Sequence, residues 1–373
     1  MALLGGLWRL PRNCQSPPSS DTLTSDELMH DESGAFRILD AAANRAGEGL
    51  RVIEDYLRFI LDDRHLTSLA KELRHDLTAA LARLPASHRL AARDTLADIG
   101  TNISTASESR RDDPTGVVAA NFKRLQQSLR SLEEYGKLID PELASKFEAL
   151  RYRTYTLERA ASITAESLQR LAAARLYVLL DGRESLRAFS ALAESLAIAG
   201  ADALQLRDKR LADRELLERA RRLREITAKT QTLFVMNDRP DLAVLARADG
   251  VHVGQDEFGV KEARAIVGPR ALVGVSTHSL EQARQAVLDG ANYLGVGPTF
   301  ISGTKSFERL AGLELLRQVA AEIRLPAFAI GGITAENVRD VLATGISRVA
   351  VSGAVISAAE PAIAFRELRK LLP

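Results

Sequence analysis

The sequence predicts an α/β protein in which an all-α helical bundle precedes a C-terminal (β/α)8 TIM barrel. Amphipathic helical patterns follow one another through the first half of the chain, whereas short aliphatic runs alternate with helical stretches beyond Arg175. That alternation is typical of βα units around a parallel sheet. The 373 residues are enough for two domains. We expect a flexible leader at 1–33, a helical domain at 34–172 and a barrel domain at 173–373.

Composition limits the classes of function. A formal net charge of +1, with 46% hydrophobic and 27% charged residues, is that of an ordinary globular protein and not of a basic nucleic-acid binder. The longest apolar runs fall far short of the roughly 20 residues of a membrane-spanning helix. A single cysteine, Cys14, excludes an internal disulfide and a cysteine-cluster metal site. We expect a cytoplasmic protein that acts on small molecules, and an oligomer is compatible with the sequence without following from it.

The helical half begins with a long amphipathic helix from Phe36. Its apolar seam repeats every three or four residues and consists of Leu39, Ala43, Ala46, Leu50, Ile53, Leu57 and Ile60. A polar stripe with the same spacing consists of Arg37, Asp40, Asn44, Glu48, Arg51 and Asp55. This stripe is either a solvated face with local ion pairs or one wall of a polar pocket between helices. Further helices are expected near 65–84, 115–138 and 141–170, with a polar connector at 92–101.

The barrel half contains eight candidate strands. They are Leu176–Leu180, Ala203–Leu206, Leu233–Met236, Gly250–Val253, Ala271–Val275, Tyr293–Val296, Ala327–Ile330 and Arg348–Val351. Eight units in about 200 residues fit a barrel better than an open doubly wound sheet, because no Gly-x-Gly-x-x-Gly motif opens the first helix.

Polar residues follow these strands at the ends where TIM barrels carry their active sites. Gln205, Arg207 and Lys209 alternate along an extended segment, so their side chains can form an oxyanion clamp on one side. The alternative is ordinary strand-end solubility. Asn237, Asp238, Asp256 and Glu257 offer oxygen ligands of the kind that hold Mg²⁺ beside a polyphosphate, although Asp238 is also suited to a turn before Arg239-Pro240. Ser276 follows the fifth strand.

The loop Gly295–Lys305 offers two hydroxyl groups, from Ser302 and Thr304, and the ammonium of Lys305. Such groups bind phosphate, although a glycine-rich turn can also be only a turn. Gly331-Gly332 and Ser352-Gly353 follow the seventh and eighth strands, where barrels of this kind bind phosphate through backbone N–H groups. One polyphosphate with metal and one monophosphate without metal suit an enzyme that joins two phosphorylated substrates.

The barrel half resembles thiamine-phosphate synthase. The resemblance is carried by Gln-Leu-Arg-x-Lys, Asn-Asp, His-Val-Gly-Gln, Gly-Val-Ser, Gly-Pro-Thr-Phe-x-Ser-x-Thr-Lys and Ile-Gly-Gly-Ile, all in family order. The run from Arg37 to Asp55 resembles a helical module that precedes some bacterial members of this family. A pyrimidine-phosphate kinase role has been suggested for that module, but no nucleotide-binding glycine loop is present here.

The resemblance implies condensation of hydroxymethylpyrimidine diphosphate with hydroxyethylthiazole phosphate, with Mg²⁺ as cofactor. It implies catalytic roles for Arg207, Lys209, Ser276 and Lys305. It places the pyrimidine diphosphate on Gln205, Arg207, Lys209, Asn237, Ser276 and Lys305, and the thiazole phosphate on Ser302, Thr304, Gly332, Val351 and Ser352. It implies Asp238 as a metal ligand. The second ligand is either Glu257 or Asp256, because the family commonly has an aspartate where this chain has Glu257.

Two other interpretations remain open from the sequence. A thiazole tautomerase has the same fold but does not need a diphosphate site, so the basic and acidic residues at the strand ends argue against it. The helical half is either a structural or regulatory module without chemistry, or a pyrimidine-phosphate kinase.

Overall fold

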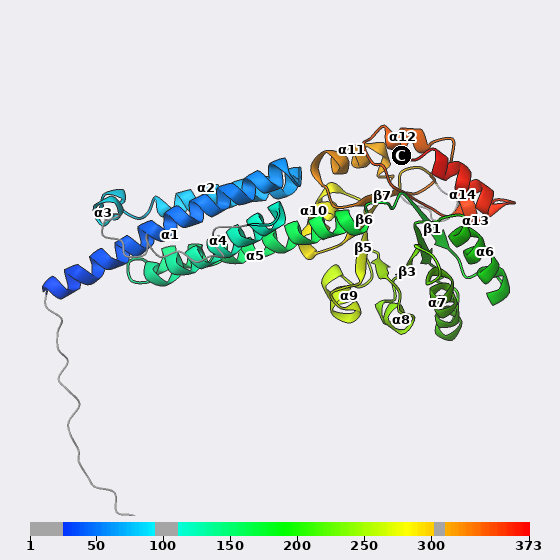
Figure 1. Cartoon of the computed structure of the whole chain (residues 1–373), viewed down its shortest axis with the longest axis horizontal. Helices are drawn as coiled ribbons and strands as arrows, with labels where there is room; N and C mark the ends of the chain where they lie inside the picture. Colours follow the sequence, from blue (N-terminus) through cyan, green and yellow to red (C-terminus); the bar gives the residue numbers. More distant parts are fainter. Residues whose placement is uncertain (1–24, 94–110, 302–309) are drawn as a thin grey trace, which may run out of the picture.

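The computed structural model describes residues 25–93, 111–301 and 310–373. It consists of an elongated helical half and a barrel half (Figure 1). Within the described ranges, no helix combines the length and apolar character needed to cross a membrane. The predicted fold class is confirmed.

The helical half consists of α1 (Ser25–Phe59), α2 (Arg64–Leu81), α3 (Ala86–Ala91), α4 (Pro114–Gly136) and α5 (Pro141–Arg170). The helices α1 and α4 pack on each other, and α2 packs on both α1 and α5 (Figure 1). Aspartates cap three helix starts: Asp63 for α2, Asp113 for α4 and Asp140 for α5 each accept a hydrogen bond from a backbone N–H of the first turn.

Two features of this half differ from the sequence prediction. Helix α1 starts at Ser25, so it includes residues assigned to the leader, because the apolar seam that defined the prediction begins only at Phe36. The short helix α3 was not predicted, since it buries no residue and therefore carries no apolar seam. Most of the predicted connector lies outside the described residues.

The polar stripe of α1 is mostly a solvated face. Asn44, Glu48, Arg51 and Asp55 are exposed. Asp40 is the exception: only 4% of it is exposed, and its carboxylate accepts hydrogen bonds from the Arg93 guanidinium at 2.7 and 2.9 Å.

The barrel half is a closed sheet of eight parallel strands in chain order. The strands are β1 (Leu176–Leu180), β2 (Ala203–Leu206), β3 (Leu233–Asn237), β4 (Gly250–Val253), β5 (Leu272–Thr277), β6 (Tyr293–Val296), β7 (Ala327–Ile330) and β8 (Val349–Val351). All eight predicted strands are present, with ends that differ by at most two residues. The helices between and after them are α6 (Leu186–Ile198), α7 (Asp213–Thr227), α8 (Pro240–Leu245), α9 (Val260–Val267), α10 (Leu280–Asp289), α11 (Gly312–Glu322), α12 (Val338–Leu342), α13 (Gly353–Ile356) and α14 (Pro361–Lys370).

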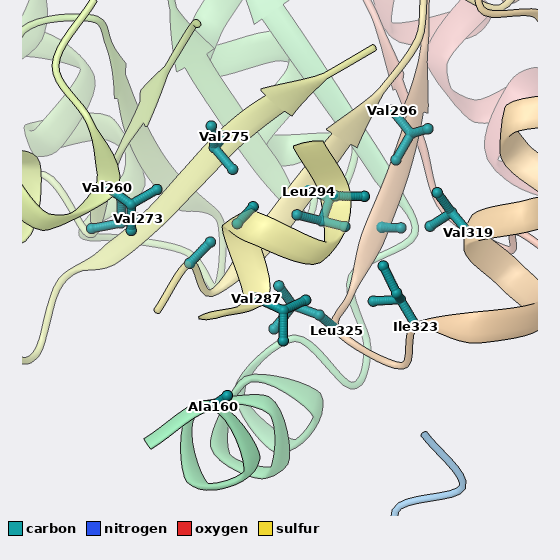
Figure 2. Close-up of a cluster of buried hydrophobic side chains, with 14 of the residues drawn as sticks. Ala160, Val260, Val273, Val275, Val287, Leu294, Val296, Val319, Ile323 and Leu325 are labelled. Atoms are coloured by element: carbon teal, nitrogen blue, oxygen red, sulfur yellow. The ribbon is translucent and has the colours of Figure 1, made fainter. Parts of the chain in front are cut away.

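Alternation along each strand separates two packing layers. Outward side chains such as Val273, Val275, Leu294 and Val296 pack against the surrounding helices (Figure 2). Inward side chains form a smaller cluster that fills the bottom of the barrel and includes Tyr177, Tyr293 and Phe328. The mouth of the barrel, at the carboxyl ends of the strands, is left for the loops.

The helical half contacts the barrel at the amino-terminal ends of β5, β6 and β7. Ala160 lies on the side of α5 that faces Val287 of α10 and Leu325 (Figure 2). Near the end of α5, the Ser167 hydroxyl oxygen accepts a hydrogen bond from the Asn292 side chain at 3.0 Å, immediately before β6. Asp63 accepts a hydrogen bond from the backbone N–H of Arg324, which follows α11. The two halves therefore share one continuous hydrophobic core on the face opposite the barrel mouth.

Candidate functional site

A cavity of about 670 Å³ lies at the barrel mouth. It brings together residues from strand ends that are far apart in the sequence. Nine of the predicted site residues line it: Gln205, Arg207, Asn237, Asp256, Glu257, Ser276, Gly332, Val351 and Ser352. Because the barrel closes, the loops after β2 and β8 border the same cavity although about 150 residues separate them.

One lysine joins two carboxylates from separate loops at the edge of this cavity. The Lys209 ammonium lies 3.0 Å from the Asp238 carboxylate and 2.9 Å from that of Glu257. The hydrogen bond to Glu257, followed by the one to Asp238, raises the pKa of Lys209. The sequence placed these three residues in one site, and the structure brings their charged groups together.

The backbone supports this arrangement at two positions. Asp238 has φ 57°, a left-handed conformation that is uncommon for a residue other than glycine. Its N–H donates to the carbonyl of His252 on β4 at 2.7 Å, which fixes the turn after β3. At Gly254, a Cβ atom would lie 2.1 Å from a carboxylate oxygen of Glu257, so the glycine gives this carboxylate the space to fold back.

The opposite side of the mouth is built from glycines. Gly331 and Gly332 have φ of 103° and 63°, which other residues rarely adopt. The backbone N–H of Phe300 donates to the carbonyl of Gly331 at 3.0 Å, so the loop after β6 lies beside the loop after β7. A Cβ atom at Gly332 would lie 2.4 Å from the Ile301 carbonyl oxygen, so only glycine permits this close approach.

Two predicted positions on that side have defined surroundings. Val351 is buried at the end of β8, and the Ser352 hydroxyl donates to the carbonyl of Leu179 at 3.1 Å. This bond ties the end of β8 to β1. Ser302, Thr304 and Lys305 lie outside the described residues, so their predicted roles stay predictions.

A structural aspartate and three polar residues of the barrel interior were not predicted from the sequence. Asp208 accepts hydrogen bonds from the backbone N–H groups of Gly182 and Arg210 and therefore links the loops after β1 and β2. Tyr177, His252 and Tyr293 face inward and line the cavity. Their signal was available, since His252 belongs to the His-Val-Gly-Gln motif and both tyrosines lie within predicted strands. Their mutual contacts depend on the barrel closing, which the sequence does not show.

His278, directly after β5, also lines the cavity. Its Nδ1 atom lies 2.5 Å from the carbonyl oxygen of Gly297.

The carboxylates fit a divalent cation only as part of a larger ligand set. The described residues contain no group of three or more His, Cys, Asp or Glu side chains arranged to hold a metal ion. However, the carboxylates of Asp238 and Glu257 both reach one cationic group, the ammonium of Lys209, within 3.0 Å. Mg²⁺ usually takes one or two carboxylates, with water and substrate phosphates completing the shell. The donor set therefore fits Mg²⁺ bound together with a diphosphate.

Comparisons with known proteins match both halves of the chain. The family described as thiamine monophosphate synthase matches residues 176–355, and the ThiD2 family matches residues 37–160. A thiamine-phosphate synthase of Rhodopirellula baltica is 46% identical over 350 residues, which covers 91% of this chain and 93% of that protein. One from Gloeobacter violaceus is 43% identical and covers 89% of this chain and 95% of that protein. The solved thiamine phosphate pyrophosphorylase of Pyrococcus furiosus is 36% identical, with a TM-score of 0.47, and covers 53% of this chain and 94% of that one.

Proposed function

The chain belongs to the thiamine-phosphate synthase family, and we propose that the cavity at its barrel mouth is where the family's reaction takes place. The protein is a transferase of thiamine biosynthesis. It condenses 4-amino-2-methyl-5-hydroxymethylpyrimidine diphosphate with hydroxyethylthiazole phosphate, which gives thiamine phosphate and pyrophosphate. The family predicted from the motifs is confirmed, and the tautomerase alternative is not favoured. As the compartment we propose the cytoplasm, in keeping with the single cysteine.

The cluster of Lys209, Asp238 and Glu257 beside the cavity is the observation that best supports the location of the diphosphate. Arg207 and Lys209 would hold the diphosphate from the β2 side, and Lys305 would hold it from the β6 loop. Asn237 would contribute its side-chain amide. As pyrophosphate departs, negative charge grows on its oxygens, and positioned cations stabilise such a transition state.

Asp238 and Glu257 would hold Mg²⁺ when the diphosphate binds. The bound ion would add positive charge next to the departing pyrophosphate. Of the two candidates for the second ligand we choose Glu257, because its carboxylate shares a cationic partner with Asp238, whereas Asp256 has only its position on the cavity wall in its favour.

The thiazole phosphate would bind across the mouth, at Gly332, Val351 and Ser352, with Ser302 and Thr304 as further contacts. Gln205 and Ser276 would hold the pyrimidine ring between the two phosphate sites. The electron-rich aminopyrimidine can carry positive charge on its exocyclic carbon, so pyrophosphate can depart before the thiazole nitrogen attacks. No nucleophile from the protein is then required, and orientation of the two substrates supplies much of the catalysis.

The test is formation of thiamine phosphate from the two purified substrates at several Mg²⁺ concentrations. We expect Asp238→Ala and Lys305→Ala each to lower kcat by about 100-fold or more, as removal of one charge-stabilising group does elsewhere. Lys261→Ala is the matched control, because Lys261 forms a 2.9 Å ion pair with Asp289 outside the cavity. An inactive intact protein, or full activity in both site variants, would contradict the proposal.

A second pair of variants separates the metal ligands. Glu257→Ala is expected to raise the Mg²⁺ concentration needed for half-maximal activity, and Asp256→Ala to leave it close to that of the unaltered protein. The opposite ranking would move the ligand to Asp256.

The helical half keeps two candidate roles, a structural or regulatory one and that of a pyrimidine-phosphate kinase. Residues 37–160 of this half match a separate family, the ThiD2 family. The experiment is to supply ATP and hydroxymethylpyrimidine phosphate to the Asp238→Ala protein. Formation of the diphosphate would establish the kinase role, and its absence would favour the structural or regulatory role.

A further inference from the structure

Five polar side chains form one hydrogen-bonded network across the inside of the barrel, and all five line the cavity. The Gln205 amide lies 2.8 Å from the Tyr177 hydroxyl, which lies 3.1 Å from that of Tyr293. The Tyr293 hydroxyl lies 3.2 Å from Nδ1 of His252, and Nε2 of His252 lies 3.0 Å from the Ser276 hydroxyl. The chain begins and ends at residues expected to touch the pyrimidine, while its middle three members had no assigned role.

The three middle residues of this hydrogen-bonded network are uncharged near neutral pH. Tyr177, Tyr293 and His252 are at most 8% exposed. Burial raises the pKa of both tyrosine hydroxyls and lowers the pKa of His252 to about 4. His252 is therefore a neutral imidazole with one protonated ring nitrogen, and the hydrogen bonds decide which nitrogen that is.

The donors and acceptors can be assigned in order. The Gln205 amide donates through Nε2 to the hydroxyl oxygen of Tyr177. Tyr177 then donates to Tyr293, and Tyr293 donates to Nδ1 of His252. That leaves the proton of His252 on Nε2, from which it donates to the Ser276 oxygen. The Ser276 hydrogen is consequently free to point into the cavity, and the Gln205 carbonyl oxygen is the unused acceptor.

The opposite order of hydrogen-bond donors and acceptors is the less stable one without substrate. It requires the Gln205 amide to be turned round, so that the buried atom with no partner becomes an NH₂ group instead of an oxygen. Buried N–H groups without partners are rarer and more costly than carbonyl oxygens with unused capacity. The forward direction leaves only the Gln205 oxygen unpaired in this chain.

Glycines on neighbouring strands leave space for the rings of the hydrogen-bonded network. Gly274 is the register partner of both His252 and Tyr293, and a Cβ atom there would lie 2.0 Å from the Tyr293 ring. A Cβ atom at Gly295 would lie 3.1 Å from the His252 ring. The two rings therefore occupy space that these two positions leave open on the inner face of the sheet.

We propose that Tyr177, Tyr293 and His252 are positioning residues that hold Ser276 as a hydrogen-bond donor toward the pyrimidine substrate. The inference rests on the proposed location of the reaction. An aminopyrimidine presents an N–H donor on its amino group and an acceptor on the neighbouring ring nitrogen. The donor of Ser276 suits the ring nitrogen, and the three positioning residues fix its orientation before the substrate arrives.

The first test does not depend on activity. In the full-length protein without substrate, ¹⁵N NMR of labelled histidine distinguishes a protonated Nε2 from a protonated Nδ1 at His252. We expect the proton on Nε2 in the unaltered protein, and a mixture of the two forms in Tyr293→Phe, which removes the donor to Nδ1. A proton on Nδ1 in the unaltered protein would overturn the proposal, whether or not the protein makes thiamine phosphate.

The second test uses kinetics. Tyr293→Phe should lower kcat/KM for the pyrimidine diphosphate by about tenfold, as expected for one lost hydrogen bond to substrate, and leave the KM for the thiazole phosphate unchanged. Tyr56→Phe, which alters a buried tyrosine of the helical half, is the control. His252→Gln keeps an N–H near the position of Nε2 and should retain more activity than His252→Leu. Equal losses in these two variants, or equal effects on both substrates, would overturn the positioning role.

Discussion

Removing the Asp63 carboxylate should destabilise the protein by about 2–4 kcal/mol. Asp63 is 1% exposed, and its two oxygens serve two different elements. One accepts from the N–H of Leu66 at 2.8 Å and caps α2, and the other accepts from the N–H of Arg324 at 2.8 Å, next to β7. In Asp63→Ala, loss of the cap costs about 1 kcal/mol. The N–H of Arg324 loses its partner at a part-buried position, which costs about 1–3 kcal/mol more.

The neighbouring residue supplies the matched control. Asp62 also pairs with Arg324, but the Asp62 side chain is 71% exposed. Such exposed ion pairs contribute about 0.2–1 kcal/mol, so Asp62→Asn should have at most that effect, because asparagine also tolerates the left-handed φ of 55° at this position. Asp63→Asn should fall between the two, because its single oxygen can serve the cap or Arg324 but not both.

Urea denaturation followed by circular dichroism measures these differences. Because the chain has two halves, fluorescence from a label on each half should be followed as well, so that separate transitions are detected. Equal destabilisation by Asp62→Asn and Asp63→Ala would refute the reasoning, since it would mean that the two buried backbone hydrogen bonds contribute no more to stability than an exposed ion pair.

Three further outcomes concern the barrel, and one of them uses a glycine of α1 as its comparison. The pKa of His252 is lowered from an ordinary value of about 6.5 to about 4. The stabilising contribution of neutral His252 is therefore complete above pH 6.5 and is lost as the pH falls toward 4. In pH-dependent unfolding, the free energy of unfolding of the unaltered protein should fall by up to about 3 kcal/mol more than that of His252→Gln. In thermal unfolding, Gly274→Ala should destabilise the protein by about 1–3 kcal/mol, because the added Cβ clashes with Tyr293. Gly47→Ala should instead stabilise the protein by about 0.5–1 kcal/mol, because Gly47 is a helix position with nothing within 4 Å of the added Cβ. Without diphosphate, Lys209→Met should tighten Mn²⁺ binding by roughly 2- to 30-fold, as measured by electron paramagnetic resonance. The reason is that the ammonium competes with the metal ion for two carboxylates, through exposed ion pairs of about 0.2–1 kcal/mol each. Weaker Mn²⁺ binding in the variant would contradict this.

The sequence predicted the strands well because each is a short aliphatic run bounded by polar residues. It also pointed to residues in or directly after the carboxyl ends of the strands, and nine of the predicted site residues line one cavity. The α1 start was misplaced, since the helix begins at Ser25, before the apolar seam from which it was predicted. Contacts that depend on barrel closure, such as that between Tyr177 and Tyr293, were out of reach, because 116 positions separate the two residues.

The choice between the two metal-ligand candidates shows the same limit. Asp256 and Glu257 are adjacent carboxylates, and their order in the sequence does not say which one faces Asp238. The distance from Glu257 to Lys209, and the space that Gly254 leaves for the Glu257 carboxylate, favour Glu257. Both observations are three-dimensional, so no pattern of spacing could have supplied them.

The two halves of the chain meet on one face of the barrel, and the cavity opens on the other. The contacts of the helical half fall at the amino-terminal ends of β5–β7, and strands of four to six residues, at about 3.3 Å per residue, separate them from the mouth by roughly 13–20 Å. The described contacts between the two halves therefore do not reach the cavity. We therefore expect Asp63→Ala to lower stability while leaving the KM of both synthase substrates unchanged at a temperature where the variant is folded. An altered KM would show that the interface is coupled to the mouth through the strands, and it would favour a regulatory role for the helical half.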